Sequence, residues 1–343
     1  MSMNKHILVT GGAGYIGSHT IVQLVEYGYI PIIADDFRNS NKIVLSGLDD
    51  IIGHQIVTHE VDICDYSQLK PLFEKYHFDG IIHFAADKAV GESVNNPLKY
   101  YKNNIGGLVN VLELSVEFNV PNFVFSSSCT VYGEPIDIKE VDELTKLSKA
   151  NSPYGNTKLI GEQILQDLHT SGSDIKIISL RYFNPIGAHP SGLIGEFPVG
   201  KPNNLLPFVT QTAIGKQKEL TVFGNDYPTT DGTCVRDYIH VCDLADAHVK
   251  ALDLLQKKER NFIDQVNIGT GKGTSVLEII TAFKKLTGEK LNWKFGPRRN
   301  GDVVEIYANV AKSESLLNWK CKYNYQDAIL HAWQWEKHLA QHV

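Results

Sequence analysis

The sequence predicts an α/β fold built on a doubly wound parallel sheet, and three observations support this prediction. Short apolar runs alternate with helical patterns from the start of the chain to about residue 182. The first of these runs leads directly into the glycine-rich turn 11–17 (GGAGYIG), which a helical pattern follows. Glycine and polar residues also follow several later runs, at the strand ends where such sheets bind ligands. Together these features predict a Rossmann-type sheet, accompanied by a smaller α/β substrate-binding domain.

The expected elements can be placed along the chain by their patterns. We expect strands near 5–10, 29–34, 55–59, 80–85, 122–127 and 175–182, and helices near 15–28, 66–77, 97–118 and 153–171. After residue 184 the sequence becomes rich in Pro, Gly and Asn, with expected helices near 205–216, 243–256, 275–287 and 325–340. We therefore expect a dinucleotide-binding domain at 1–184, to which the chain returns around 236–270, and a substrate-binding domain at 185–343.

The glycine-rich turn fits a dinucleotide-binding fingerprint in two ways, as Gly12-x-Gly14-x-x-Gly17 or as Gly11-x-x-Gly14-x-x-Gly17. Small residues let the backbone approach a pyrophosphate, whose charge then lies at the N-terminus of a helix. Asp35 ends the second apolar run about 20 residues later, where this fold places an acid that binds the ribose. A carboxylate there favours NAD over NADP, because it would repel a 2′-phosphate. The alternative is that Asp35 only ends a strand.

Tyr154 and Lys158 lie four residues apart in the helix expected at 153–171. Residues at this spacing share one face of a helix, so we expect the ammonium of Lys158 near the phenol of Tyr154. The pKa of an ordinary tyrosine is about 10, and a neighbouring cation lowers it, which would make Tyr154 a base at neutral pH. The same spacing also occurs on solvated helix faces, but the dinucleotide fingerprint upstream favours a redox base.

The composition argues against a broad nucleic-acid or membrane surface. The chain has 343 residues, and 33 Lys and Arg against 39 Asp and Glu give a formal net charge of −6. Its 5 cysteines contain no C-x-x-C pair and indicate reduced thiols rather than disulfides or a metal site. No apolar run is long enough to span a membrane, and the first expected strand begins too early for a signal peptide. We expect a cytoplasmic protein without a metal.

The motifs and their order resemble the extended short-chain dehydrogenase/reductase superfamily, and within it the UDP-glucose 4-epimerase family. The superfamily features are the glycine-rich turn, the three serines at 126–128, the Tyr154/Lys158 pair and the segment 181–185 (RYFNP). The segments that resemble the epimerase family are 84–94 (FAADKAVGESV), 126–133 (SSSCTVYG), 202–205 (PNNL), 223–228 (FGNDYP), 235–241 (VRDYIHV) and 297–302 (PRRNGD). The resemblance covers essentially the whole chain.

This resemblance implies a role for individual residues. It makes Tyr154 the base and acid, Lys158 its activator and the holder of the nicotinamide ribose, and Ser128 the partner of the sugar 4-hydroxyl. The implied NAD-binding residues are Gly11, Gly14, Tyr15, Ile16, Gly17, Asp35, Asp36, Asn39, Asp62, Ile63, Phe84, Ala85, Lys88, Asn103, Ser126, Tyr154, Lys158 and Tyr182. The implied UDP-sugar-binding residues are Lys88, Ser128, Tyr154, Phe183, Asn184, Asn204, Leu205, Thr221, Phe223, Arg236, Tyr238, Arg299, Asp302 and Ile306.

The implied reaction is the reversible epimerisation at C4 of UDP-galactose and UDP-glucose, a step of galactose metabolism, through a transient 4-keto sugar and tightly bound NAD. Oxidation at C4 needs a proton acceptor at O4 and a hydride acceptor over C4, which a phenolate and NAD⁺ supply. The homodimers of the family imply a homodimer here, with the helices expected at 97–118 and 153–171 as its contact.

Two positions bear on specificity. Asp36 stands where the family usually has asparagine, and this extra carboxylate further disfavours a 2′-phosphate. Ile306 aligns with the residue that decides in this family whether a larger N-acetylhexosamine fits, so we expect partial tolerance of UDP-N-acetylglucosamine.

The same residues also bear on other functions. A UDP-N-acetylglucosamine or UDP-glucuronate 4-epimerase stays open, because turnover alone would distinguish it. A sugar-nucleotide 4,6-dehydratase would need an Asp-Glu pair where this chain has Cys129 and Thr130, neither of which is a carboxylic acid. A non-catalytic NAD-binding regulator would have no need of Ser128, Tyr154 and Lys158 together.

Overall fold

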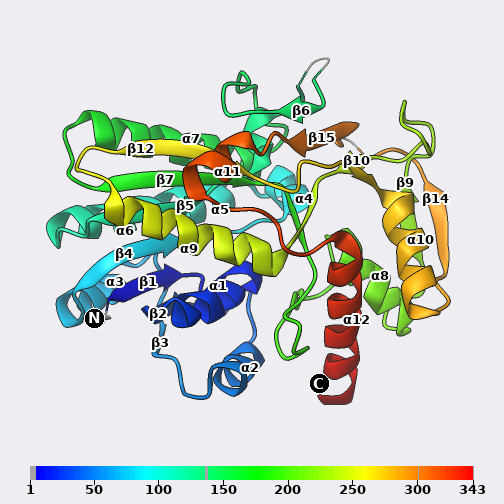
Figure 1. Ribbon diagram of the computed structural model, residues 1–343, viewed down its shortest axis with the longest axis horizontal. Coiled ribbons are helices and arrows are strands. Elements are labelled where there is room, and N and C mark those ends of the chain that lie inside the picture. Colours follow the sequence, from blue (N-terminus) through cyan, green and yellow to red (C-terminus); the bar gives the residue numbers. More distant parts are fainter. Residues whose placement is uncertain (1–4, 136–137, 300, 343) are drawn as a thin grey trace.

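A parallel sheet of seven strands forms the larger part of the molecule in this computed structural model, which describes residues 5–135, 138–299 and 301–342 (Figure 1). Its strand order is β3-β2-β1-β4-β5-β7-β12, and every neighbouring pair is parallel. The strands are β1 (His6–Thr10), β2 (Ile30–Asp35), β3 (Thr58–Glu60), β4 (Phe78–His83), β5 (Asn122–Ser126), β7 (Lys176–Tyr182) and β12 (Ile263–Ile268). The predicted Rossmann-type, doubly wound α/β fold is confirmed.

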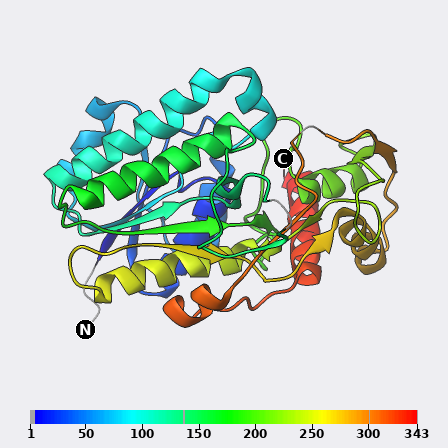
Figure 2. The same cartoon turned by 90° about the horizontal axis from the view of Figure 1, so that it is seen from above.

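Helices cover both faces of this sheet, and the strands alternate their side chains between the two layers. In β1, Ile7 and Val9 belong to one apolar core, whereas Leu8 belongs to the other. The first core contains residues of α1 (Tyr15–Glu26), α2 (Ile43–Ile52), α9 (Val241–Lys257) and α11 (Ala311–Leu317). The second contains residues of α3 (Tyr66–Lys75), α6 (Gly107–Glu117) and α7 (Pro153–Thr170). Figure 2 shows α6 and α7 on one side of the sheet and α9 on the other.

Four helical segments differ from the sequence predictions, among them α11, which was not predicted. The helix expected at 97–118 consists of α5 (Pro97–Tyr100), a π-helical turn η1 (Tyr101–Gly106) and α6. The helix α2 was not predicted, and neither was the short α4 (Val90–Asn95) that precedes α5. None of the helices in the described part of the chain has the length and apolar character to cross a membrane.

The remaining elements form a second lobe beside the carboxyl ends of the large sheet (Figure 1). A separate apolar core joins α8 (Leu205–Ala213), α10 (Val276–Thr287) and α12 (Tyr325–His342). Short strands complete it in small sheets: β6 (Glu140–Val141), β8 (Asn184–Ile186), β9 (Leu220–Phe223), β10 (Val235–Arg236), β11 (Tyr238–His240), β13 (Thr274–Ser275), β14 (Trp293–Gly296) and β15 (Glu305–Ala308). Between these segments, α9 and β12 join the first lobe; the exact division of the chain at 184/185 stays a prediction.

Candidate active site

The predicted site residues gather where neighbouring parallel strands end. The glycine-rich turn follows β1, Asp35 ends β2, residues 84–88 follow β4, and residues 126–128 close β5. All these strand ends lie at the same edge of the sheet, because the strands are parallel. The order of the strands reverses between β1 and β4, and this switch point is where doubly wound sheets bind ligands.

The glycine-rich turn has space for backbone but not for side chains. Gly11 has a φ of +70°, and a Cβ there would lie 2.8 Å from the nitrogen of Ala85. A Cβ on Gly17 would lie 2.3 Å from the carbonyl oxygen of Gly11. Gly14 is the N-cap of α1, so the N–H groups of the first helical turn point toward the turn's opening. These features fit a pyrophosphate at the N-terminus of α1.

Gly12, which belongs to only one of the two possible glycine triplets, also has no room for a side chain. A Cβ on Gly12 would lie 3.0 Å from the Ile33 side chain and 3.0 Å from the Val9 carbonyl oxygen. Gly12 therefore serves the packing of the turn against β1 and β2, whereas Gly11 supplies the left-handed backbone. Glycine is needed at both Gly11 and Gly12, so the structure does not favour one triplet over the other.

The carboxylate of Asp35 stabilises the glycine-rich turn and the loop after β2 by hydrogen bonds. One of its oxygens, Oδ2, accepts the N–H of Ala13 at 3.0 Å, and Oδ1 accepts the N–H of Phe37 at 2.9 Å and the hydroxyl of Ser40 at 2.9 Å. Burial raises the pKa of Asp35, and these hydrogen bonds oppose the shift. The carboxylate thus has a structural function at the same place where a ribose would bind, so the two interpretations from the sequence are compatible.

Tyr154 is positioned by the first turn of α7. The helix begins with Ser152, whose hydroxyl accepts the N–H of Gly155 at 3.1 Å, followed by Pro153 at the first helical position. A Cβ on Gly155 would lie 3.3 Å from Cβ of Thr130, so glycine lets α7 start closely against the 3₁₀ turn η2 (Cys129–Tyr132). Ser128 is the N-cap of that turn. Ser128 and the phenol of Tyr154 are close enough that the serine affects the pKa of the phenol.

The protonation of Tyr154 differs from the sequence prediction. Burial raises the pKa of Tyr154 well above its usual value, Tyr182 raises it further, and the hydrogen bond from Ser128 opposes the shift. Lys158 is not among the largest causes of this shift. Its ammonium instead donates to the carbonyl oxygen of Ser126 at 2.7 Å and lies 4.9 Å from the centroid of the Phe125 ring. The pKa of Tyr154 is therefore raised, not lowered as the sequence predicted, because helical spacing does not report desolvation.

Lys158 and Ser126 still have unused hydrogen-bonding capacity. An ammonium has three donors, and one of those of Lys158 bonds to Ser126. The hydroxyl of Ser126 is buried without a hydrogen bond of ordinary geometry among the described residues, and it lies close enough to the Tyr182 phenol to lower the pKa of that group. Burial lowers the pKa of Lys158 to about 8, and Glu162 opposes this shift. A buried hydroxyl without a partner is rare, and these groups fit a polar ligand such as the ribose or carboxamide of a dinucleotide.

Two contacts connect the first lobe with the segment that leads into the second. The hydroxyl of Tyr15 donates to the carbonyl oxygen of Gly187 at 2.7 Å. The ammonium of Lys88 lies 3.0 Å from Glu196, and the side-chain amide of Asn204 donates to the same carboxylate oxygen at 2.6 Å. Glu196 therefore holds two predicted ligand-binding residues from different lobes.

Arg236, Arg299 and Asp302 form a charged group in the second lobe. Asp302 lies 2.6 Å from Arg299 and 3.9 Å from Arg236. The guanidinium of Arg299 lies over the ring of Phe223, which is 43% exposed. Two arginines beside an exposed aromatic ring suit a nucleoside diphosphate, whose base can stack and whose phosphates accept paired N–H donors.

The other predicted residues occupy both lobes. Asn39 donates to Asp87 at 2.7 Å, and the amide of Asn103 donates to Asn104 at 3.0 Å. The remaining positions are Ile16 in α1, Asp62 and Ile63 after β3, Phe84 and Ala85 after β4, Tyr182 in β7, Phe183 and Asn184 next to β8, Leu205 in α8, Thr221 in β9, Tyr238 in β11 and Ile306 in β15. Ile63 and Ile306 are buried in apolar cores. Asn300, within one of the motifs, lies outside the described residues.

Residues 7–269 of the chain match the model of the NAD dependent epimerase/dehydratase family. A UDP-glucose 4-epimerase 2 of Arabidopsis thaliana is 49% identical over 336 residues, which cover 97% of this chain and 95% of the relative. The chain belongs to the NAD dependent epimerase/dehydratase family. A UDP-glucose 4-epimerase of Bacillus subtilis is 48% identical over 330 residues, covering 96% of both chains.

Solved epimerase structures of the family share the fold over nearly the full length. The UDP-glucose 4-epimerase of Bifidobacterium longum in complex with NAD⁺ and UDP has a TM-score of 0.94 and 41% identity, covering 99% of this chain and 100% of that one. The corresponding enzyme from Stenotrophomonas maltophila, with bound NAD and a formylated UDP-arabinopyranose, has a TM-score of 0.95 and 43% identity, with coverage of 99% and 100%.

Sequence reasoning missed two residues that the structure places among the predicted ones. Glu196 was missed because its partners lie 108 and 8 residues away in the chain. Arg38 lies three residues after Asp35 and pairs with Asp36 and Asp62. A cation so close to the expected ribose acid was a usable signal, but its partner on the loop after β3 was not visible in the sequence.

Proposed function

We propose that this chain interconverts UDP-galactose and UDP-glucose by inverting the configuration at C4, with NAD as its cofactor. The observation that carries the proposal is the meeting of Tyr154 and Ser128 at the same sheet edge as the glycine-rich turn, in a chain of the NAD-dependent epimerase family. The near-complete coverage of UDP-glucose 4-epimerases by this chain supports the same substrates.

The residues that would hold NAD are those of the crevice. The glycine-rich turn accepts the pyrophosphate, Asp35 the adenosine ribose, and Lys158 and Ser126 the nicotinamide end. When bound there, NAD would supply the hydride acceptor for C4 and the hydride donor for the reduction, and would be unchanged overall. The unpartnered hydroxyl of Ser126 and the restricted space at Gly11 and Gly17 support this fit.

Tyr154 takes the proton from O4 in the oxidation and gives it back in the reduction. Since burial raises its pKa, the phenolate needs positive charge nearby. Lys158 supplies such charge below its pKa of about 8, together with the positive ring of the oxidised cofactor. Ser128 keeps the hydroxyl of the sugar oriented toward the phenol. The chemistry therefore depends on a base that becomes active only when the crevice is loaded.

Binding of the diphosphate would let the sugar rotate within the site without dissociating. Arg236 and Arg299 would hold it in the second lobe, remote from the reacting carbon. The keto sugar can then present its other face to the same hydride while its tail stays fixed. Binding energy from the tail is used in this way to retain an intermediate that must not diffuse away.

The proposal is tested with Tyr154→Phe, which removes the hydroxyl and keeps the ring. Purified protein is incubated with UDP-galactose and no added nucleotide, and UDP-glucose is measured by chromatography. The natural protein is expected to convert the sugar, whereas the variant loses about 10²–10⁴-fold in rate, the range of general acid–base catalysis. The dinucleotide content of both proteins is measured in parallel, so that loss of cofactor is separated from loss of the base. A variant of undiminished rate would contradict the assigned role.

We also propose that the protein acts as a homodimer in the cytoplasm. Its five cysteines are free thiols, which suits a reducing compartment. Two apolar side chains on neighbouring helices, Val94 and Leu98, are 60% and 79% exposed and support a contact with a second copy.

A further inference from the structure

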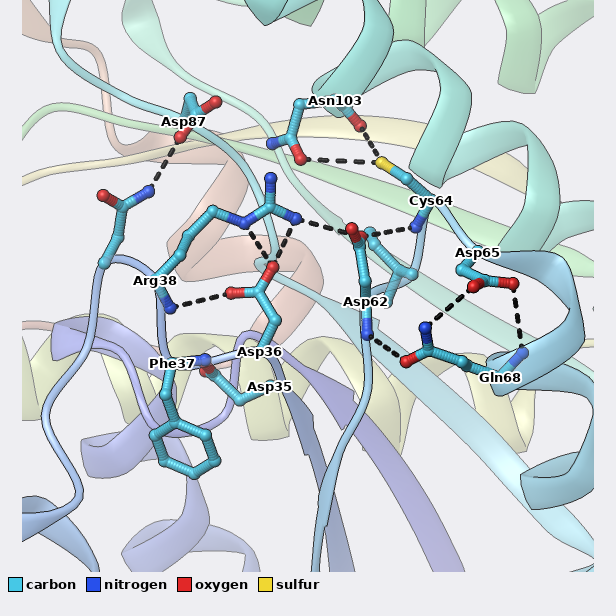
Figure 3. A network of polar contacts seen from close by, with 12 residues as sticks. Asp35, Asp36, Phe37, Arg38, Asp62, Cys64, Asp65, Gln68, Asp87 and Asn103 are labelled. Atoms are coloured by element: carbon cyan, nitrogen blue, oxygen red, sulfur yellow. Dashed lines mark hydrogen bonds and ion pairs between the residues drawn. The ribbon is translucent and has the colours of Figure 1, made fainter.

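Arg38 lies three residues after Asp35, at the carboxyl end of β2, where the adenosine ribose of a dinucleotide binds in this fold; Figure 3 shows it in contact with Asp36 and Asp62. Its guanidinium forms an ion pair with Asp36 and another with Asp62, at 2.9 Å. Asp35 lies directly before this group, at the end of β2. Two carboxylates thus pair with one guanidinium, and with Asp35 close by in the chain the local charge is negative.

A cation at this place needs an explanation. Arginine near the end of the second strand is the residue that accommodates a 2′-phosphate in NADP-dependent proteins of this fold. This chain belongs to an NAD-dependent family and still carries such an arginine. The difference lies in the partners of Arg38, because a guanidinium already paired with two carboxylates has fewer donors to offer to a phosphate.

Both carboxylates are held in place by backbone groups. Oδ1 of Asp36 accepts the N–H of Arg38 at 3.0 Å, and Oδ1 of Asp62 accepts the N–H of Cys64 at 2.8 Å. The acids are therefore fixed before any ligand arrives. The side chains of Arg38, Asp36 and Asp62 are 39%, 25% and 37% exposed, and ion pairs this exposed contribute little to folding stability. Stability alone does not account for the arrangement.

We propose that Asp36 and Asp62 determine the choice of NAD over NADP by occupying Arg38, and that removal of one acid converts Arg38 into a receptor for a 2′-phosphate. This inference rests on the proposed function, since it concerns the cofactor of the same site. Asp36 has two effects: it repels a 2′-phosphate directly and it keeps the nearby guanidinium engaged. The second effect distinguishes the inference from simple charge repulsion.

The test measures which dinucleotide the protein carries. Protein is equilibrated with equal concentrations of NAD and NADP until the bound fractions stop changing, free nucleotide is removed, and the released dinucleotides are quantified by chromatography. The variants are Asp36→Asn, which removes the charge but keeps an acceptor for the N–H of Arg38, Arg38→Gln, and the two combined. Asp50→Asn, an exposed acid on α2, is the control for loss of one negative charge.

We expect Asp36→Asn to raise the bound NADP:NAD ratio at least about tenfold, since a charge-assisted contact to phosphate replaces a repulsion. The combined variant should lose most of that gain, and Asp50→Asn should match the natural protein. A gain that persists without Arg38 would overturn the inference and leave repulsion as the cause. An unchanged ratio in Asp36→Asn would overturn it as well.

Two further measurements separate other causes of failure. If Asp36→Asn does not fold, Asp62→Asn carries the same expectation, because it also releases Arg38. NAD retained by a variant shows that its crevice is intact. A natural protein that binds neither dinucleotide would instead contradict the proposed function.

Discussion

Tyr154 and Lys158 both lie almost wholly out of water, and burial moves their pKa values in opposite directions. The pKa of the phenol rises because its charged form is the phenolate, whereas the pKa of the ammonium falls to about 8 because its charged form is the protonated one. Burial thus favours the neutral form of each residue. In the proposed mechanism, Tyr154 therefore loses its proton only beside positive charge.

Ile306 is the residue at which substrate range can be tested. It is buried, it pairs with Arg236 across β15 and β10, and it shares an apolar core with Phe183. We expect the natural protein to turn over UDP-N-acetylglucosamine in part, and Ile306→Tyr to reduce this turnover at least about tenfold. A larger ring does not fit a packed core, so it must take space from the sugar. The turnover of both UDP-sugars is measured by chromatography.

The matched control is Ile306→Val, which shortens the side chain and keeps its branching. It should leave turnover of the N-acetyl sugar intact or raise it, while UDP-galactose turnover changes little in all three proteins. No turnover of UDP-N-acetylglucosamine by the natural protein would remove the hypothesis of partial tolerance.

The sequence could predict site residues that follow local rules but not those that depend on the folded neighbourhood. Gly11 and Tyr154 stand in motifs whose spacing has a physical meaning. Arg38 and Glu196 acquire their importance from partners on other elements, such as Asp62. The pKa of Tyr154 was predicted in the wrong direction for the same reason, because desolvation is a property of the whole surroundings.

At the scale of elements, His248 on α9 links helix packing to pH. It is fully buried; its Nδ1 lies 2.8 Å from the carbonyl oxygen of Leu244, and its ring lies 4.6 Å from that of Phe84. Burial lowers the pKa of His248 to about 4. The unfolded chain, with a histidine pKa of about 6.5, binds the proton more readily. The stability that depends on neutral His248 is therefore full above pH 6.5 and falls as the pH decreases toward 4.

His248→Gln tests this linkage. The natural protein should lose about 1.4 kcal/mol of unfolding free energy per pH unit from this group between pH 6.5 and 4, and the variant should show a slope shallower by that amount. Urea unfolding at a series of pH values measures it. His54→Gln, which removes an exposed histidine, is the control. Parallel slopes for His248→Gln and the natural protein would contradict the prediction.

The spacing of apolar residues predicted the large elements, because each of these helices and strands buries one face or both faces in an apolar core. The strands of the parallel sheet and the helices α1, α7 and α12 are of this kind. The π-helical turn η1 could not be predicted, since it differs from an α-helix only in its hydrogen bonding and has the same apolar pattern. α2 was missed although it lies between the strands expected at 29–34 and 55–59, where parallel strands need a crossover connection.

At the scale of the whole molecule, side-chain hydrogen bonds and an ion pair connect the two lobes. Tyr15 bonds to Gly187, and Lys88 to Glu196. His240, the N-cap of α9, accepts the N–H of Cys242 at its Nδ1, so its Nε2 carries the proton and donates to His331 of α12 at 3.0 Å.

Leu98 on α5 carries the last prediction, which concerns assembly. Its side chain is 79% exposed, and α5 lies against α4 and α7, where Val94 is 60% exposed. Exposed apolar side chains on neighbouring helices mark an interface. We expect the natural protein to sediment as a particle of twice 38.3 kDa. Leu98→Glu should sediment as the monomer, because symmetry would bring a buried charge into the contact from each copy. Val57→Glu, at an exposed apolar residue before β3, should stay dimeric. A monomeric natural protein, or a dimer that survives Leu98→Glu, would show that α5 is not the contact.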